Sequence, residues 1–202
     1  MQIVLATRNQ HKAVELERIL LELDLQFELL TVGKFPNAPE VEETEDTFQG
    51  NALLKARALC EFTGLPAIAD DSGICIDALA GSPGVLSARW SGATENIDQA
   101  NVDLVLAQTA EVPDGQRGAQ FQCAAVAVFP DGTEFVSVGS MPGSLLRAPR
   151  GSNGFGYDPI FVADGYEITN AELTAGQKDS ISHRGQALRL LAIQMKEHLA
   201  SS

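Results

Sequence analysis

Basic residues are scarce in this sequence. Its 202 residues include 14 Lys and Arg against 27 Asp and Glu, which gives a formal net charge of −13. This charge would repel a polyanion such as DNA or RNA unless basic residues gathered locally, and no basic cluster is visible along the chain. We therefore expect no nucleic-acid polymer as a partner. A small anionic ligand would need a metal ion or basic residues gathered from distant segments.

Long apolar runs and paired cysteines are also absent. No run approaches the roughly 20 apolar residues that a membrane-spanning helix needs, and the apolar start at residues 1–7 lacks the basic residues of a secretion signal. The three cysteines, Cys60, Cys75 and Cys123, show no C-x-x-C pairing and are best interpreted as small buried apolar residues. We expect a cytoplasmic protein with no membrane partner.

Composition and pattern predict an α/β protein. Apolar residues make up 45% of the chain and charged residues 20%, which is ordinary for a globular protein. The length suits one domain over residues 1–202, with two lobes that share a cleft. Strands are predicted at 2–6, 27–32, 67–69, 119–129 and 133–139, helices at 9–23, 46–62, 96–109 and 182–199, and loops at 33–45, 80–93 and 150–157. Strands alternate with helices first and a hairpin follows, which indicates a mixed sheet.

The turn over residues 7–12 joins the first predicted strand to a helix. Free backbone N–H groups and the helix dipole favour an anion at such a place. Thr7 and Asn9 add side-chain donors, and Lys12 lies one turn into the helix, within reach of a phosphate. The glycines of a P-loop are missing, so a capped surface helix is the alternative.

Five carboxylates stand among the seven residues 40–46, ahead of the second predicted helix. Such a run is most often a solvated loop. It also suits a hard cation, because Mg²⁺ takes few protein oxygens and keeps several waters. Asn51 and Lys55, four residues apart, share one face of the helix that follows. That face is a candidate wall of the same site.

The segment Asp70-Asp71-Ser72-Gly73 follows the short apolar stretch 67–69. We expect its two carboxylates to close a buried strand, at the edge where open sheets bring residues to their ligands. Neighbouring carboxylates are costly there unless a cation or hydrogen-bond donors offset them. A metal site with a general base is one interpretation, and a simple Asp-Ser-Gly turn is the other.

The stretch 151–159 combines glycines with two aromatic residues. Glycines let backbone approach a ligand closely, and the rings of Phe155 and Tyr157 offer flat faces to a base. A loop with two packed aromatics is the alternative.

A further candidate cluster precedes and opens the last predicted helix. Ser182 is a good N-cap for this helix, so His183 and Arg184 stand in its first turn, after Lys178. Cations there oppose the helix dipole. This placement indicates a phosphate or base oxygen as a partner, and an exposed cap is an equal alternative.

Together these motifs resemble the inosine/xanthosine triphosphate pyrophosphatase family, whose members hydrolyse non-canonical purine nucleotides. The similarity runs from Ile3 to about Leu191. Six elements in order carry it: the Thr7–Lys12 turn, Thr47-Phe48-x-x-Asn51-Ala52-x-x-Lys55-Ala56, Ala69-Asp70-Asp71-Ser72-Gly73, Gly84-Val85-x-Ser87-Ala88-Arg89, Gly154-Phe155-Gly156-Tyr157-Asp158-Pro159 and Ser182-His183-Arg184-Gly185. Arg8 departs from the pattern, since many relatives have a small residue there, and this leaves its role open between phosphate and solvent.

The resemblance implies a twisted mixed sheet with helices, two lobes around a central cleft, and usually a homodimer. It implies Mg²⁺-dependent hydrolysis of a nucleoside triphosphate at the α-phosphorus, with pyrophosphate leaving. Asp71 would be the proton acceptor and a metal ligand, helped by Glu42 or Glu43, a choice that the variable loop leaves open. The substrate-binding set would be Thr7, Arg8, Asn9, Gln10, His11, Lys12, Asn51, Lys55, Ser72, Phe155, Gly156, Tyr157, Asp158, Lys178, His183 and Arg184.

Charge and hydrogen bonding extend this hypothesis. Mg²⁺, Lys12 and Lys55, with Arg8 as an optional further cation, would neutralise the triphosphate while Asp71 orients or deprotonates the attacking water. Hypoxanthine and xanthine carry an acceptor oxygen at position 6, where adenine has a donor amino group. Donors supplied by His183, Arg184 or nearby backbone would therefore satisfy the first two bases and reject adenine.

Other functions also suit parts of this pattern. A pyrophosphatase of the same architecture for another modified or pyrimidine nucleotide differs only in its substrate. A non-catalytic nucleotide-binding regulator is a second alternative, but binding alone does not need the carboxylates of Asp70 and Asp71. A purely structural protein would leave the clustered donors and carboxylates unexplained.

Overall fold

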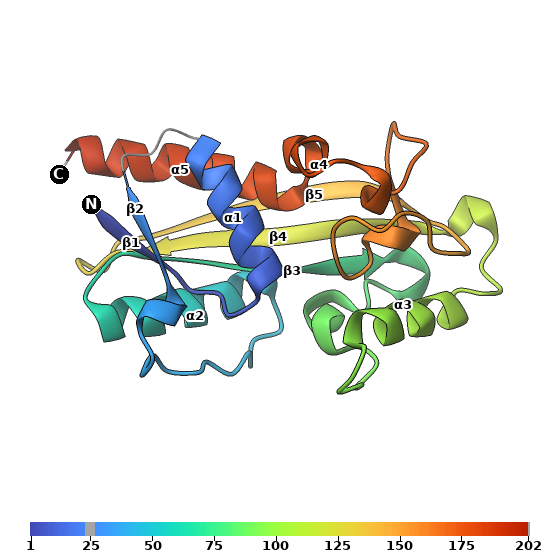
Figure 1. The fold of residues 1–202 in the computed structure, drawn as a ribbon, viewed down its shortest axis with the longest axis horizontal. Helices are drawn as coiled ribbons and strands as arrows, with labels where there is room; N and C mark the ends of the chain where they lie inside the picture. Colours follow the sequence, from blue (N-terminus) through green and yellow to red (C-terminus); the bar gives the residue numbers. More distant parts are fainter. Residues whose placement is uncertain (23–26, 202) are drawn as a thin grey trace. The chain divides into compact units, whose positions relative to one another are not determined.

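The computed structural model describes residues 1–22 and 27–201, and Figure 1 shows their arrangement. The strands are β1 (Gln2–Leu5), β2 (Glu28–Thr31), β3 (Ala67–Ile76), β4 (Gly118–Val128), β5 (Glu134–Leu145) and β6 (Phe161–Ala163), and the α-helices are α1 (Gln10–Glu22), α2 (Phe48–Thr63), α3 (Ile97–Gln108), α4 (Ala175–Ile181) and α5 (His183–Ser201). Short 3₁₀ turns lie in the connections. None of the helices in the described part of the chain is long and apolar enough to cross a membrane.

The strands form one mixed sheet in the order β2-β1-β3-β4-β5-β6. Strand β1 pairs in parallel with both β2 and β3, whereas β5 pairs antiparallel with β6. Parallel neighbours require a crossover connection, which α1 supplies between β1 and β2. The mixed sheet with helices confirms the predicted α/β class.

The chain divides into two compact units. The first holds Met1–Asp71, Cys123–Gly139 and Arg184–Ser202, and the second holds Ser72–Gln122 and Ser140–His183. Strands β3, β4 and β5 each contribute residues to both units. The cleft between two lobes that the sequence suggests stays a prediction.

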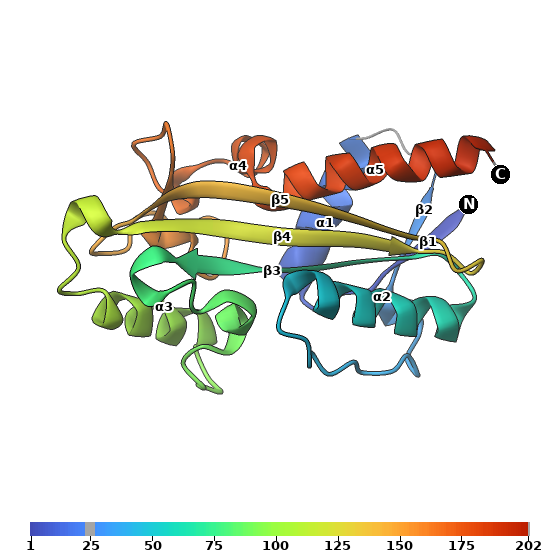
Figure 2. The same cartoon turned by 180° about the vertical axis from the view of Figure 1, so that it is seen from behind.

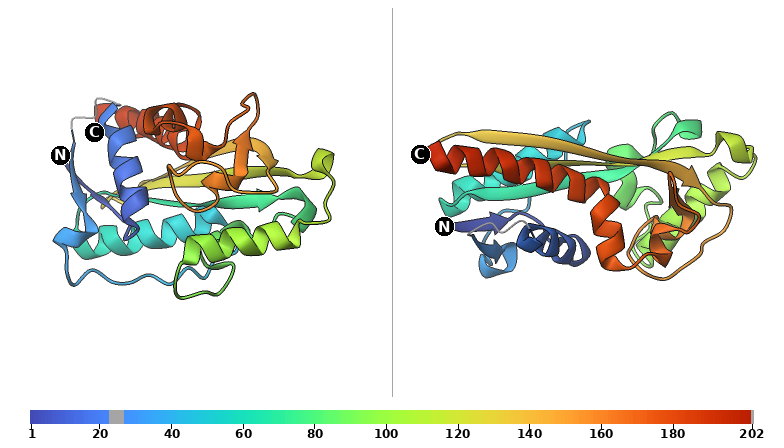
Figure 3. Two further views of the ribbon diagram at one scale, coloured as in Figure 1. Left: turned by 45° about the vertical axis from the view of Figure 1, so that its right-hand side comes forward. Right: turned by 90° about the horizontal axis from the view of Figure 1, so that it is seen from above.

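In the first unit the sheet is buried on both faces. Ile3 and Leu5 of β1 pack with α1 and α5, and Val4 between them packs with α2. Figure 2 shows α5 and α2 on opposite sides of the strands in this unit, and Figure 3 shows the start of β1 and the last turns of α5 at the same end of it. Because neighbouring residues of a strand face opposite ways, the continuous apolar run of β1 contributes side chains to the apolar core on each face of the sheet.

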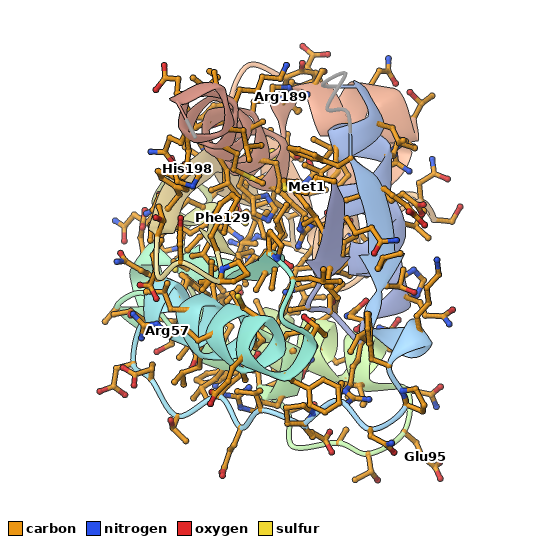
Figure 4. All side chains as sticks on the ribbon, turned by 90° about the vertical axis from the view of Figure 1, so that its left-hand side faces the viewer. Met1, Arg57, Glu95, Phe129, Arg189 and His198 are labelled. Atoms are coloured by element: carbon orange, nitrogen blue, oxygen red, sulfur yellow. The ribbon has the colours of Figure 1, made fainter. Side chains whose placement is uncertain are left out.

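Three rings pack together in the first unit, those of Phe129, Phe135 and His198. Figure 4 shows Phe129 beside His198, and their ring centroids lie 4.8 Å apart. Phe135 meets both rings edge-on, at 6.0 Å from Phe129 and 5.5 Å from His198. Edge-to-face contacts of this kind are favourable beyond the area that they bury.

The second unit has its own apolar core. Helix α3, drawn in green in Figure 1, contributes Val102 and Val105, which pack with Ile74 and Ile76 of β3. Residues of β4, β5 and β6 complete this core, together with the ring of Tyr157.

Two details differ from the sequence-based expectation. Strand β3 continues to Ile76, so Asp70-Asp71-Ser72-Gly73 lies inside a strand instead of forming a turn at its end. Helix α4 was not expected, and it starts with a capping box formed by Thr174 and Gln177.

Candidate active site

Strand β3 turns its two adjacent carboxylates to opposite faces of the sheet. Asp70 shares a face with Ile68, which packs with α1 and α5, and Asp71 shares a face with Ala69, which packs with α2. Both side chains are buried, with exposed fractions of 2% for Asp70 and 5% for Asp71. The same residue type therefore meets two different sets of partners.

On its face, Asp70 is surrounded by cations. Its Oδ2 lies 3.3 Å from the Lys12 Nζ and 3.2 Å from the Arg184 Nε. Burial acts to raise the pKa of Asp70, but Lys12, Arg184 and Lys55 outweigh it and hold that pKa well below its usual range. Asp70 is therefore a permanent anion that organises these cations, and it is a poor proton acceptor.

Glu15 is a member of this group that the sequence reasoning missed. It lies on α1, is buried, and accepts a hydrogen bond from the Arg184 Nη1. Arg184 is thus held between Glu15 and Asp70 inside the first unit. A signal was present in the sequence, because Glu15 interrupts the apolar face that Leu16 and Ile19 define.

On the opposite face, Asp71 meets two residues of α2. The Asn51 Nδ2 donates to Asp71 Oδ2 over 3.3 Å, and the Lys55 Nζ lies 3.5 Å from Asp71 Oδ1. Burial raises the pKa of Asp71, and the charges of Glu43 and Asp70 add to this effect, which exceeds the opposing influence of Lys55 and Lys12. Asp71 therefore holds a proton more readily than an ordinary aspartate, as a general base requires.

Asn51 and Lys55 also fix the acidic loop. Asn51 accepts from the Glu45 N–H at 3.0 Å and donates to the Glu45 carbonyl at 3.2 Å. Lys55 contacts the Glu43 Oε1 at 3.1 Å and donates to the Asp70 carbonyl at 2.8 Å. The expected proximity of Asn51, Lys55 and the loop is found, and Glu43 is the loop carboxylate that shares Lys55 with Asp71.

The chemistry of this donor set suits Mg²⁺. Glu43 and Asp71 both contact the ammonium group of Lys55, whereas the Glu42 side chain is exposed. Among the described residues, no group of three or more His, Cys, Asp or Glu side chains is arranged to hold a metal ion by itself. Mg²⁺ is usually bound by one or two carboxylates, with phosphate oxygens and waters completing its shell, so Glu43 and Asp71 fit this requirement.

The turn over residues 7–12 caps α1 with its own side chains. Asn9 accepts from the Lys12 N–H at 3.1 Å, and Thr7 accepts from the Asn9 N–H at 3.3 Å. The Arg8 guanidinium donates to the Ala38 carbonyl at 2.9 Å, which gives it a partner in the protein. Gln10 and His11 follow as exposed residues in the first turn of the helix.

In the second unit, Asp158 is the centre of a further polar group. Its Oδ2 accepts from the Lys178 Nζ at 2.6 Å and from the Phe155 N–H at 3.0 Å, and its Oδ1 accepts from the Asn170 Nδ2 at 3.2 Å. The Lys178 ammonium also lies 5.0 Å from the centre of the Phe155 ring, within the range of a cation–π contact. Asn170 was not singled out from the sequence.

Two predicted binding rings are buried in the second unit. Tyr157 is 4% exposed, packs in the apolar core, and donates its hydroxyl proton to the Ser87 carbonyl at 2.8 Å. Burial and the nearby charge of Asp98 raise the pKa of Tyr157. The His183 ring stacks on Phe121 with their centroids 5.0 Å apart. Tyr157 therefore matches the alternative expected for this loop, that of a packed aromatic residue.

The motif at residues 84–89 supports β3 next to Ser72, which is half-buried. The Ser87 Oγ accepts from the Ile74 N–H at 2.9 Å, and a Cβ on Gly73 would lie 2.3 Å from that oxygen. Only glycine fits this close approach. The predicted site residues thus fall into two sets: Ser72, Phe155–Asp158, Lys178 and His183 belong to the second unit, and the others belong to the first.

Comparison with known proteins identifies the family of the chain. The family model described as the Ham1 family matches residues 3–194 of the chain. The chain belongs to the Ham1 family. This confirms the resemblance drawn from the six motifs.

Ham1 relatives match over nearly the whole chain. A dITP/XTP pyrophosphatase of Streptomyces coelicolor is 52% identical and covers 98% of each chain, and one of Frankia alni is 54% identical over the full length of both. A solved Ham1 protein of Coxiella burnetii has a TM-score of 0.87 at 40% identity and covers 98% of this chain and 99% of its own. The dITP/XTP pyrophosphatase structure of Mycobacterium abscessus has a TM-score of 0.77 at 50% identity, covering 95% and 98%.

Proposed function

We propose that this chain hydrolyses non-canonical purine nucleoside triphosphates, namely dITP, ITP and XTP, to the monophosphate and pyrophosphate. The observation that carries the proposal is the contrast on β3. Asp71 is a buried carboxylate of raised pKa, next to Lys55 and Glu43, while Asp70 on the other face is a fixed anion. The names of relatives about half identical over their full length support the substrate class.

Phosphate binding falls to the first unit. Lys12 and Lys55 carry positive charge at the two faces of β3, and the Thr7–Lys12 turn adds the N-terminal end of α1. A helix N-terminus and ammonium groups together favour a polyphosphate. They provide the local positive charge that a protein of net charge −13 needs for an anionic substrate.

Glu43 and Asp71 are the residues that would hold Mg²⁺. When bound, the ion would stabilise negative charge on the phosphate oxygens. Asp71 would also accept the proton of the attacking water, because it lies with Lys55 and Glu43 on the face of α2, whereas Asp70 is paired with Lys12 and Arg184. Asp70 stays ionised and keeps Lys12 and Arg184 in place.

Base recognition is assigned to the second unit and to the start of α5. Phe155 offers a ring, and His183 offers a donor whose ring plane is set by the stack on Phe121. Arg184 remains a candidate donor, but its removal would also unpair Glu15 and Asp70. His183→Ala is therefore the cleaner variant for testing the preference for ITP over ATP.

We also propose that the protein acts as a homodimer in the cytoplasm. The family resemblance supports the dimer, and the three free cysteines are consistent with a reducing compartment. Light scattering coupled to size-exclusion chromatography tests the dimer, since a protein of 21.5 kDa would elute with about twice that mass.

A substrate panel tests the activity. Purified protein is incubated with Mg²⁺ and ITP, dITP, XTP, ATP or GTP, and pyrophosphate and phosphate are measured separately. We expect pyrophosphate from ITP, dITP and XTP and little from ATP. Phosphate alone would identify a different cleaved bond, and no product from any substrate would refute the proposed activity. A preference for another modified nucleotide would retain the reaction and change the substrate.

A further inference from the structure

The segment Gly154–Asp158 contains two glycines in a backbone conformation that other residues rarely adopt. Gly154 has a φ of 72° and Gly156 a φ of 59°, both in the left-handed region. Glycine loses more conformational freedom on ordering than any other residue. Hydrogen bonds that fix this backbone therefore also fix the direction in which Phe155 points.

Two consecutive backbone N–H groups in this segment donate to carboxylates. The Phe155 N–H donates to the Asp158 Oδ2 at 3.0 Å, and the Gly156 N–H donates to the Asp98 Oδ2 at 2.9 Å. These N–H groups belong to the two peptide planes on either side of the Phe155 Cα. Because peptide planes are rigid, fixing both fixes the φ and ψ of Phe155 and hence the direction of its Cα–Cβ bond.

The two carboxylates differ in where they come from. Asp158 belongs to the segment itself, whereas Asp98 stands 58 residues away in the first turn of α3. Helix α3 is a firm support, because Val102 and Val105 lie in the core and Asn101 donates to the Ser87 carbonyl at 3.2 Å. Asp98 thus ties the peptide between Phe155 and Gly156 to a packed helix.

We propose that Asp98 is a positioning residue for the nucleotide: it fixes the Phe155–Gly156 peptide so that the Phe155 ring is presented in one orientation. This inference rests on the proposed function, in which Phe155 faces the base. Asp98 itself is exposed, and the proposal gives it no part in the chemical step. Its effect is on binding, because an untethered segment must be ordered anew each time a nucleotide binds.

The test compares three variants of the full-length protein. Asp98→Ala removes the acceptor, Asp98→Asn keeps an oxygen that can accept from Gly156, and Asp103→Ala is the matched control. Asp103 is exposed on the same helix, where its Oδ1 accepts from the Gln99 Nε2 at 2.8 Å. The KM and kcat for ITP are measured with Mg²⁺, together with hydrogen exchange of the Gly156 amide by NMR.

We expect Asp98→Ala to raise the KM about three- to tenfold, which corresponds to the loss of one hydrogen bond to a charged group at an exposed position. The kcat should change less than about twofold, because uniform binding is affected and not the chemical step. The Gly156 amide should exchange faster. Asp98→Asn should restore most of the wild-type KM, and Asp103→Ala should match the wild type throughout.

Three outcomes would overturn the inference. An unchanged KM with faster Gly156 exchange would show that the contact exists without positioning the nucleotide. An Asn variant as impaired as the Ala variant would assign the effect to charge instead of to the hydrogen bond. Unchanged Gly156 exchange in Asp98→Ala would remove the contact altogether. Failure of the proposed function is distinguishable, because the wild-type protein itself would then release no pyrophosphate.

Discussion

Asp70 and Asp71 are neighbours in sequence, identical in chemistry and both buried, yet the two faces of β3 give them opposite properties. On the face of α1 and α5, Lys12 and Arg184 hold the pKa of Asp70 far below its usual range. On the face of α2, burial and the charge of Glu43 raise the pKa of Asp71. Neighbouring carboxylates whose pKa values are driven apart mark a division between an acid–base group and an electrostatic support.

The largest expected difference between Asp70 and Asp71 is in the rate of turnover. We expect Asp71→Asn to lower kcat for ITP by about a hundred- to ten-thousand-fold, the range for loss of a general base. Nucleotide binding should persist, because Lys12 and Lys55 remain. Steady-state kinetics and calorimetric titration with ITP measure the two quantities. A protein with Asn at position 71 that turned over at the wild-type rate would remove the proposed base, and Asp103→Asn serves as the control.

The second contrast is in stability. We expect Asp70→Asn to lower the free energy of unfolding by about 3–5 kcal/mol, because it breaks a buried ion pair and leaves Arg184 with one carboxylate fewer. Asp71→Asn should leave stability unchanged or raise it, since a carboxylate of raised pKa is a charge that burial disfavours. Urea unfolding of both variants measures the difference. Equal losses at the two positions would contradict the assignment of the faces.

The sequence predicts the elements of the first unit well, because their patterns are strong. The continuous apolar run of β1 and the spacing of Leu16, Ile19 and Leu20 in α1 follow directly from burial on both faces of a sheet. The order of the six motifs also predicts the family. In these places local preference and tertiary packing agree.

The same reasoning fails where packing overrides preference. Asp70-Asp71-Ser72-Gly73 has the composition of a turn, but β3 continues because Ile74 and Ile76 enter the second core. For Tyr157 the loop pattern left a base-facing ring and a packed ring open, and its hydroxyl bond to the Ser87 carbonyl depends on the tertiary fold. Such partners lie 70 residues apart, and no local pattern specifies them.

A third prediction distinguishes Glu43 from Glu42 in the acidic loop before α2. Glu43→Gln should raise the Mg²⁺ concentration needed for half-maximal activity about tenfold, because loss of one group in or beside a metal's shell typically costs ten- to a hundredfold. Glu42→Gln should leave that concentration unchanged, since Glu42 is exposed and Glu43 alone shares Lys55 with Asp71. Magnesium titrations of the pyrophosphatase activity measure both. The reverse result would move the metal to the other carboxylate.

The smallest expected effect is in the pH dependence of stability, measured in metal-free buffer. Asp70 has a pKa below that of the unfolded chain, about 3.9, so it stabilises the folded protein above that pH and loses this contribution as pH falls further. The amount by which Asp70→Asn is less stable than the wild type should therefore become smaller as the pH falls below about 4. Asp71 has a raised pKa, so its ionisation costs stability as pH rises above the unfolded value. The free energy of unfolding of Asp71→Asn should therefore rise relative to that of the wild type between acidic and neutral pH. Parallel curves for the two variants would mean that the two faces of β3 treat their carboxylates alike.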